Sequence, residues 1–338
     1  MLFSSSIALA ALSLASVANG LSILMSNDDG FGSGNLRELY KILKADGHDV
    51  WIVAPATDQS GQGGRSDFSK FANLTAPSEF NLIPAGAPAI GPDPIDNQIW
   101  YYNGTPAACV FVALDYVLPR YGSFKTPDLV VSGPNFGTNL GPFLYTLSGT
   151  MGATYAAVGR SIPGIAFSGS NPSVPYFNVT NSTNQATWTA AVSARVIKSF
   201  IEATPKGQAI FPLGYGANVN IPPLNASYTN PPIFKTRLTG NADIDLAAWN
   251  ETTKTFHYAN LEPQAAGINS CINGDCSLPG ETYVVEGGGV SVSIFTVDYD
   301  APLNPYTTMV YNKLDGIVAN ATTPSRRKFK RSSVYTHP

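Results

Sequence analysis

The chain has 338 residues, of which 44% are hydrophobic and 13% are charged, and its formal net charge is −3. This composition predicts a globular protein with a substantial core, built as one large α/β domain with extensions or as two domains. The negative charge argues against binding of a nucleic-acid polymer, which usually needs a basic face. The N-terminal apolar stretch is short for a membrane span and no other segment reaches ~20 apolar residues, so we expect no membrane insertion.

The beginning of the chain is typical of an export signal. Residues 1–18 are apolar and small and end in Ser16-Val17-Ala18, a small-x-small cleavage pattern, although no Lys or Arg precedes the apolar run. The N-x-[ST] sequons are at Asn73, Asn103, Asn178, Asn181, Asn225, Asn250 and Asn320. Signal and sequons together predict a secreted glycoprotein, extracellular or in a cell wall. We expect Asn103, which precedes a helix-capping turn, to be unmodified, and Asn178 or Asn181 to carry glycan.

The three cysteines fit an oxidising compartment. Cys271 and Cys276 bracket a tight Asn-Gly-Asp loop and predict a local disulfide. Cys109 lies among apolar residues at helical spacing with no His nearby, which favours a buried thiol over a nucleophile.

The predicted elements begin with a βαβ unit. Residues 22–26 and 49–54 are typical of buried strands, and apolar residues between them recur at helical spacing up to Gly47. A long loop over 55–97 comes next. The later expected elements are strands at 99–102, 129–131 and 164–167, and helices at 106–118 (opened by Thr105 and Pro106), 149–158 and 186–203. This alternation predicts an α/β fold with a doubly wound, mostly parallel sheet.

We expect four parts along the chain: a signal peptide (1–18), an α/β core (21–205), a β-rich extension (206–315) and a basic, disordered tail (316–338). The extension contains Pro-interrupted, strand-like segments and little helical periodicity. It is therefore expected to pack on the core or to exchange with a neighbouring subunit.

Two adjacent carboxylates follow the first predicted strand, in the string Ser26-Asn27-Asp28-Asp29-Gly30. In open α/β sheets, ligands bind at the carboxyl ends of the strands. Neighbouring carboxylates repel each other unless a cation or a proton lies between them. Because oxygen ligands suit Mg²⁺, Mn²⁺ or Ca²⁺ better than Zn²⁺, we expect a hard divalent cation at Asp28 and Asp29.

Three further polar loops follow predicted structural elements. They are Pro55–Gly61, Ser132–Gly141 and Ser148-Gly149-Thr150. The last opens a helix, and a helix N-terminus with Gly and Thr binds anions through free backbone N–H groups. Acids for a metal beside an anion site predict metal-assisted phosphate chemistry.

The chain resembles the SurE family of metal-dependent phosphatases and nucleotidases. The resemblance rests on Ile23–Gly30, Val53–Gly61, Gly104–Val110, Pro127–Gly141 with Ser148–Thr150, Asn218–Pro222 and Val284–Val292. These segments occur in the family's order and spacing over roughly residues 22–300. The resemblance implies a Rossmann-like three-layer sandwich with C-terminal arms that make homodimers or higher oligomers, and phosphomonoester hydrolysis, often of nucleoside monophosphates.

The resemblance also implies roles for single residues. Asp28, Asp29, Ser60 and Asn135 match the metal ligands, with Mg²⁺ or Mn²⁺ as the expected ion. Asn139, Ser148, Gly149 and Thr150 match positions around the bound phosphate. The expected reaction is in-line attack of metal-activated water, with Asp28, Asp29, Asn139 and Ser148 as the catalytic set. The chain departs from the family pattern at Ala108 and Pro134 and in the 55–97 loop, which leaves substrate preference and assembly open.

Within this class, a 5′- or 3′-nucleotidase and a broad acid phosphatase both remain open. A haloacid-dehalogenase-type enzyme would place Asn27 at its nucleophile position, and Asn cannot form the aspartyl-phosphate. A dinucleotide site is disfavoured by Asn35 at the third Gly position. The remaining alternative is a secreted glycoprotein that keeps the fold without activity. His48, His257 and His337 are poor candidates for a catalytic set.

Overall fold

A computed structural model describes residues 20–238, 244–261, 277–298, 300–302, 304–315 and 317. The expected signal peptide, both cysteines of the expected disulfide and all of the tail except residue 317 lie outside the described residues. The chain divides into two compact units, Met1–Asp298 and Tyr299–Pro338, which are treated separately below.

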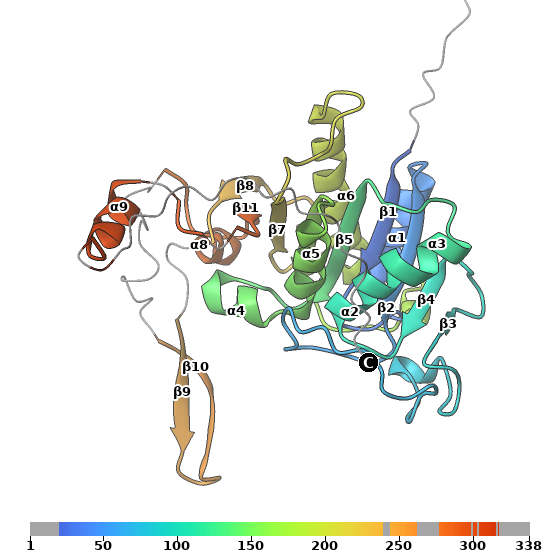
Figure 1. Ribbon diagram of the computed structural model, residues 1–338. Helices are drawn as coiled ribbons and strands as arrows, with labels where there is room; N and C mark the ends of the chain where they lie inside the picture. The colour runs from blue at the N-terminus through green and yellow to red at the C-terminus, as the bar shows by residue number, and fades with distance from the viewer. Residues whose placement is uncertain are drawn as a thin grey trace, which may run out of the picture. The chain divides into compact units, whose positions relative to one another are not determined.

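A nine-stranded sheet among the described residues forms the centre of the first unit (Figure 1). Its strands, in spatial order, are β3 (Ile90–Pro92), β4 (Ile99–Tyr102), β2 (Asp49–Pro55), β1 (Ser22–Ser26), β5 (Leu129–Phe136), β6 (Gly164–Gly169), β7 (Tyr215–Ile221), β11 (Val290–Thr296) and β8 (Ile233–Thr236). The strands from β4 to β7 are all parallel, whereas β3 and β11 run antiparallel to their neighbours β4 and β7. The expected mostly parallel sheet is confirmed.

Helices cover both faces of this sheet. On one face, α1 (Gly34–Ala45) packs against α6 (Gln185–Ala203), and on the other α2 (Pro106–Val112) packs against α5 (Gly149–Gly159). The side chains of strand β1 alternate between the two faces of the sheet. Ile23 and Met25 belong to the core beneath α1 and α6, whereas Leu24 belongs to the core beneath α2 and α5. Side chains of a strand point to opposite faces in turn, so a fully buried strand needs two cores. The molecule is a three-layer α/β sandwich.

The helix predicted over 106–118 is divided in the structure. After α2 the chain continues as a π-helical turn, η2 (Ala113–Val117), and ends in α3 (Leu118–Tyr121). Pro119 explains the change, because it has no backbone N–H to continue the α-helical hydrogen-bond series.

Residues beyond 205 contribute directly to the central sheet. β7 extends the parallel series beside β6, and β11 and β8 follow it. The boundary expected at residue 205 therefore does not coincide with an edge of the sheet. Within the same stretch β9 (Ile244–Asn250) and β10 (Thr255–Leu261) pair as a separate antiparallel hairpin.

The smaller elements are α4 (Gly141–Leu147), α8 (Glu281–Glu286), α9 (Pro305–Asn312) and the single turns η1 (Glu79–Asn81) and η3 (Tyr176–Asn178). None of the helices in the described part of the chain is long and apolar enough to cross a membrane.

The chain changes face between β1 and β5. The β1–β2 connection runs through α1 on one face, and the β4–β5 connection runs through α2 on the other. Because β1 and β5 are adjacent and parallel, their carboxyl ends meet where the connections diverge. Crevices of this kind are the usual ligand sites of open α/β sheets.

Candidate active site

The acid pair lies at the carboxyl end of β1. Asp28 and Asp29 are 3% and 2% exposed, so both are buried. The Thr150 hydroxyl donates a hydrogen bond of 2.6 Å to Asp28 Oδ1, and the Phe136 N–H donates one of 3.2 Å to Asp29 Oδ2. Among the described residues, Asp29 Oδ1 has no hydrogen-bond partner although it is buried. Such an orphaned oxygen is costly in a folded protein and indicates a missing ligand.

The electrostatics of the pair point to a cation. Burial raises the pKa of Asp28 to about 6. Burial, and then the charge of Asp28, raise the pKa of Asp29 well above its usual range, with smaller contributions from Asp58 and Glu79. A divalent cation would compensate these charges and ligate the orphaned oxygen, so the residues present fit a metal site.

The loop that contains Ser60 is tied to the acid pair through its backbone. The Gln59 N–H donates to the Asp28 carbonyl at 2.7 Å. Asp58 Oδ1 accepts from both the backbone N–H and the hydroxyl of Ser60, at 2.9 and 2.7 Å, which closes an Asx turn. The Ser60 side chain is exposed at this turn. Asp58 was not predicted from the sequence as a site residue; through this turn it positions Ser60.

Asn135 lies next to the acid pair because β5 is irregular at this point. The register between β5 and β6 shifts between Ser132 and Asn135, a change typical of a β-bulge, which re-aims the side chains that follow it. Asn135 is 9% exposed and donates through Nδ2 to the Gly137 carbonyl at 3.0 Å. The next residue, Phe136, is the one that binds Asp29.

Helix α5 begins against the acids. Ser148 is its N-cap, with Oγ accepting from the Met151 N–H at 3.2 Å. Gly149 is closely packed, since a Cβ at this position would lie 2.9 Å from both Asp28 Cβ and Pro106 Cγ. The close packing requires glycine here. The first turn of α5 therefore lies beside Asp28, and the anion site expected at this turn stays a prediction.

Asn139 takes part in a different set of hydrogen bonds. Its Nδ2 donates to Ser168 Oγ at 2.8 Å, its backbone N–H donates to Asn220 Oδ1 at 2.8 Å, and its carbonyl accepts from Asn218 and Asn220. These bonds lead toward β6 and β7. The structure thus brings Asp28, Gly149 and Thr150 into contact. It places Ser60 in the loop that binds the Asp28 carbonyl and Asn135 near the end of β5. Asn139 belongs to a neighbouring network.

Glu281 anchors this second network and was missed from the sequence. It is fully buried at the start of α8, where Oε1 accepts from the Gly141 N–H at 2.7 Å and Oε2 accepts from Ser293 Oγ at 3.0 Å and Asn218 Nδ2 at 3.2 Å. Burial raises its pKa to about 8. The signal that could have revealed it is the alternation Asn218-Val-Asn220 in a buried strand, because buried amides need polar partners.

The remaining candidate groups lie elsewhere. His48 Nδ1 accepts from the Leu21 N–H at 3.0 Å, and burial lowers its pKa. Cys109 is free and buried, as expected, and burial raises the pKa of its thiol. In the described part of the chain, no group of three or more His, Cys, Asp or Glu residues could hold a metal ion.

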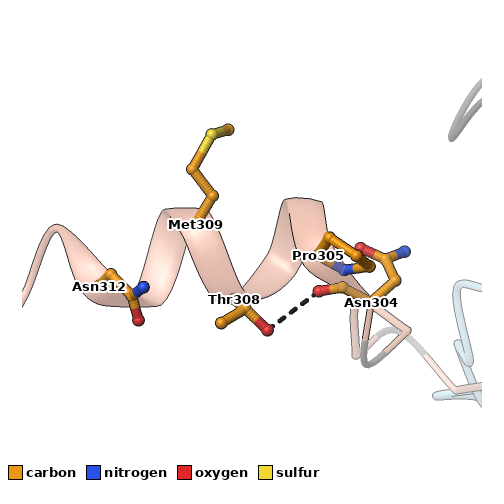
Figure 2. Close-up of a pocket in the computed structure, with 5 residues that line it drawn as sticks. All are labelled: Asn304, Pro305, Thr308, Met309 and Asn312. Carbon is orange, nitrogen blue, oxygen red and sulfur yellow. Dashed lines mark hydrogen bonds between the residues drawn. The ribbon is translucent and has the colours of Figure 1, made fainter.

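In the second unit, a hollow of about 780 Å³ lies along α9. Figure 2 shows its lining residues, with the Thr308 hydroxyl bonded to the Asn304 carbonyl at 3.0 Å. None of the lining side chains that the structure describes is ionisable.

Comparisons with known proteins agree with this geometry. A family model described as "Survival protein SurE" matches residues 23–243. An acid phosphatase of Yarrowia lipolytica is 43% identical over 290 residues, which cover 83% of this chain and 80% of that protein. A 5′-nucleotidase SurE of Wolbachia sp. subsp. Drosophila simulans is 37% identical over 146 residues, 43% of this chain; the match spans 50% of the relative.

A solved structure, the SurE protein of Aquifex aeolicus, aligns with a TM-score of 0.59 and 24% identity, covering 87% of this chain and 99% of that one. This likeness supports the fold, and the family model and the Yarrowia relative establish the family. The chain belongs to the SurE family, as its motifs indicated.

Proposed function

We propose that this chain hydrolyses phosphomonoesters at the acid pair, with nucleoside monophosphates as substrates. The relatives are named acid phosphatase and 5′-nucleotidase, which are both phosphoric monoester hydrolases, and this chain is an enzyme of that class. The observation that carries the proposal is the buried pair Asp28/Asp29, with one orphaned oxygen, facing the first turn of α5.

The cation site of this proposal consists of Asp28, Asp29, Ser60 and Asn135. Asn135 uses its amide N–H on Gly137, so its amide oxygen is the atom that would bind the ion. All four donors are oxygens, which suits Mg²⁺ or Mn²⁺. When bound, the ion supplies positive charge that makes water more acidic and stabilises negative charge on phosphoryl oxygens.

The phosphate group would bind at the first turn of α5. The Gly149 and Thr150 N–H groups and the positive end of the helix attract its oxygens. Ser148 orients this turn as the N-cap. Asn139, fixed by its bonds to Asn218 and Asn220, defines the side of the site toward β7 and would stabilise the charge that develops on the phosphoryl group.

In the proposed step, a water oxygen attacks phosphorus in line with the ester oxygen. The P–O bond to the alcohol breaks as the new P–O bond to the water oxygen forms. Asp29 takes the proton of the attacking water at Oδ2, since Oδ1, the oxygen without a partner among the described residues, would ligate the cation. The departing alcohol oxygen takes up a proton from solvent. Products are inorganic phosphate and the free alcohol. Because water is the nucleophile, no side chain carries phosphate at any stage.

A substrate panel tests this proposal. Purified protein is assayed with 5′- and 3′-nucleotides, sugar phosphates and a chromogenic ester, before and after EDTA and with Mg²⁺ or Mn²⁺ restored. We expect metal-dependent turnover with nucleotides preferred. Equal rates across the panel would assign a general acid phosphatase. Full activity after EDTA, or phosphate trapped on a side chain, would contradict the mechanism, and absence of turnover would favour the non-enzymatic alternative.

A further inference from the structure

A groove of about 530 Å³ includes in its lining Gln59, whose backbone N–H binds the Asp28 carbonyl. Two segments line it, residues 59–71 and 103–105. Two phenyl rings in the first segment are exposed, Phe68 by 51% and Phe71 by 63%. They are accompanied by Lys70 and by the ion pair Arg65–Asp67, with 2.6 Å between Nη2 and Oδ2. The groove thus combines aromatic faces with polar and charged side chains.

The segment that carries these rings is held by hydrogen bonds to the residues before α2. Thr105 Oγ1 donates to the Arg65 carbonyl at 2.6 Å and accepts from the Asp67 N–H at 3.0 Å. The Ser69 N–H donates to the Tyr102 hydroxyl at 2.9 Å, and Ser69 Oγ donates to the Phe71 carbonyl at 2.8 Å. Phe68 and Phe71 are therefore exposed on a well-tied segment, which is the arrangement of a preformed binding surface.

Residues that line the groove lie next to residues of the proposed phosphate site. At one end, Gln59 binds the Asp28 carbonyl, and the Gly63 N–H donates to the Leu147 carbonyl at 2.8 Å, just before Ser148. At the other end, Thr105 directly precedes Pro106, whose ring packs against Gly149 and Asp28. A phosphomonoester bound at α5 would direct its alcohol group along these rings.

The chemistry of the groove selects a planar group with polar edges. Aromatic side chains stack on nucleobases of every kind, because each base has a π-face. Arg65, Lys70 and the amide of Gln62 offer donors to the edges of such a ring. An aliphatic alcohol would gain little from these groups.

We propose that the groove lined by Phe68 and Phe71 is the leaving-group subsite and binds the nucleobase of a nucleoside monophosphate by stacking. The proposal rests on the proposed function and defines its substrate class. It also gives a reason for Asn103, whose Nδ2 donates to Ser69 Oγ at 3.3 Å, to remain without glycan, since a glycan there would fill the groove.

The test compares substrates across variants at the two rings. In the double variant Phe68→Ala/Phe71→Ala, the ratio of kcat/KM for adenosine 5′-monophosphate to that for glycerol phosphate should fall about 10-fold. Phe68→Tyr/Phe71→Tyr should restore the ratio because the rings remain. Tyr121→Ala is the matched control: Tyr121 is 51% exposed at the end of α3 and does not line the groove. An unchanged ratio, or equal loss on both substrates, would overturn the proposal.

Two further measurements separate this proposal from the proposed function. Binding of adenosine, which has no phosphate, is measured by calorimetry in the Asp29→Asn variant. Adding Phe68→Ala and Phe71→Ala to that variant should abolish the binding. This result does not depend on whether the protein is a phosphatase. The proposal of a nucleobase site would be excluded if the Asp29→Asn protein did not bind adenosine. It would also be excluded if the two Ala substitutions lowered kcat/KM for 4-nitrophenyl phosphate and for no other substrate. Peptide mapping that finds glycan on Asn103 would also overturn it.

Discussion

Two buried carboxyl clusters of the same unit, the acid pair and the Glu281 network, differ in their hydrogen bonding. Glu281 accepts three hydrogen bonds through its two oxygens, from Gly141, Ser293 and Asn218. The carboxylates of the acid pair accept hydrogen bonds from the Thr150 hydroxyl and the Phe136 backbone N–H, and one of their oxygens is orphaned among the described residues.

This difference in hydrogen bonding distinguishes a structural carboxyl group from a pair that forms a binding site. A buried carboxyl whose oxygens have donors holds its neighbours in place, whereas one that lacks donors requires a ligand. Through its hydrogen bonds, Glu281 of α8 connects β11, β7 and the start of α4. It thereby holds Asn218, which donates to the Asn139 carbonyl. Asp28 and Asp29 instead leave binding capacity for a cation. Substitution should therefore affect stability at one cluster and activity at the other.

The largest expected effect is on activity at the acid pair. Asp28→Asn or Asp29→Asn keeps the shape of the side chain but removes a charge, and should lower kcat/KM by about 100-fold or more. Without metal, either variant should unfold no more easily than the parent, because one repulsive charge is gone. Steady-state kinetics and calorimetric Mn²⁺ titration measure the loss. Asp115→Asn, an exposed acid paired with Arg160, is the matched control. A near-normal rate in either variant would refute the metal site.

The next effect is on stability at Glu281. Glu281→Ala leaves the donors of Gly141, Asn218 and Ser293 without their acceptor and opens a cavity, so the free energy of unfolding should fall by about 3 kcal/mol. Urea unfolding followed by circular dichroism measures it. Glu202→Ala, an exposed Glu on α6, should change stability by less than about 0.5 kcal/mol. Equal stability of the two variants would show that the network does not hold the sheet.

The pH dependence sharpens the comparison. The folded-state pKa of Glu281, about 8, lies above the ordinary value of 4.5, so folding favours its protonated form. The contribution of Glu281 to the free energy of unfolding is complete below pH 4.5 and is lost as the pH rises to 8. Over this range the free energy of unfolding falls by at most about 1.4 kcal/mol per pH unit because of this group.

Glu281→Gln should flatten this part of the stability profile. Asn218 Oδ1 has no partner among the described residues, so a rotated Asn218 amide could accept from the new Gln N–H. Unfolding curves at pH 5, 6.5 and 8 test this. The same slope in both proteins would assign the pH dependence to another group.

The smallest effect concerns the single hydroxyl on Asp28. Thr150→Val removes the 2.6 Å hydrogen bond and should lower kcat/KM by about 10-fold. Thr150→Ser should restore it. Thr154→Val is the control, because the Thr154 hydroxyl is equally buried but donates to the Thr150 carbonyl. Equal losses in the two Val variants would mean that the effect is one of helix packing.

The sequence by itself determined the elements that depend on local patterns. Strand β1 with the two acids that follow it, helix α5 opened by Ser148-Gly149-Thr150 and Gly47 after α1 were all predicted at or within one or two residues of their observed places. Hydrophobic period, cap chemistry and turn residues act over a few neighbouring positions, so they can be read without a fold. The family resemblance could also be found from local sequence, because its motifs are short runs of neighbouring residues.

Tertiary structure alone decided which distant residues meet. Thr105 stands at the N-cap of α2 as predicted, yet its hydroxyl binds Arg65 and Asp67 and so shapes the groove instead of capping the helix. β7, β8 and β11 join the main sheet past the expected boundary at residue 205. Glu281 reaches Gly141 across 140 positions of sequence. Strand register and long-range packing set such contacts, and no local pattern encodes the partner of a buried polar group.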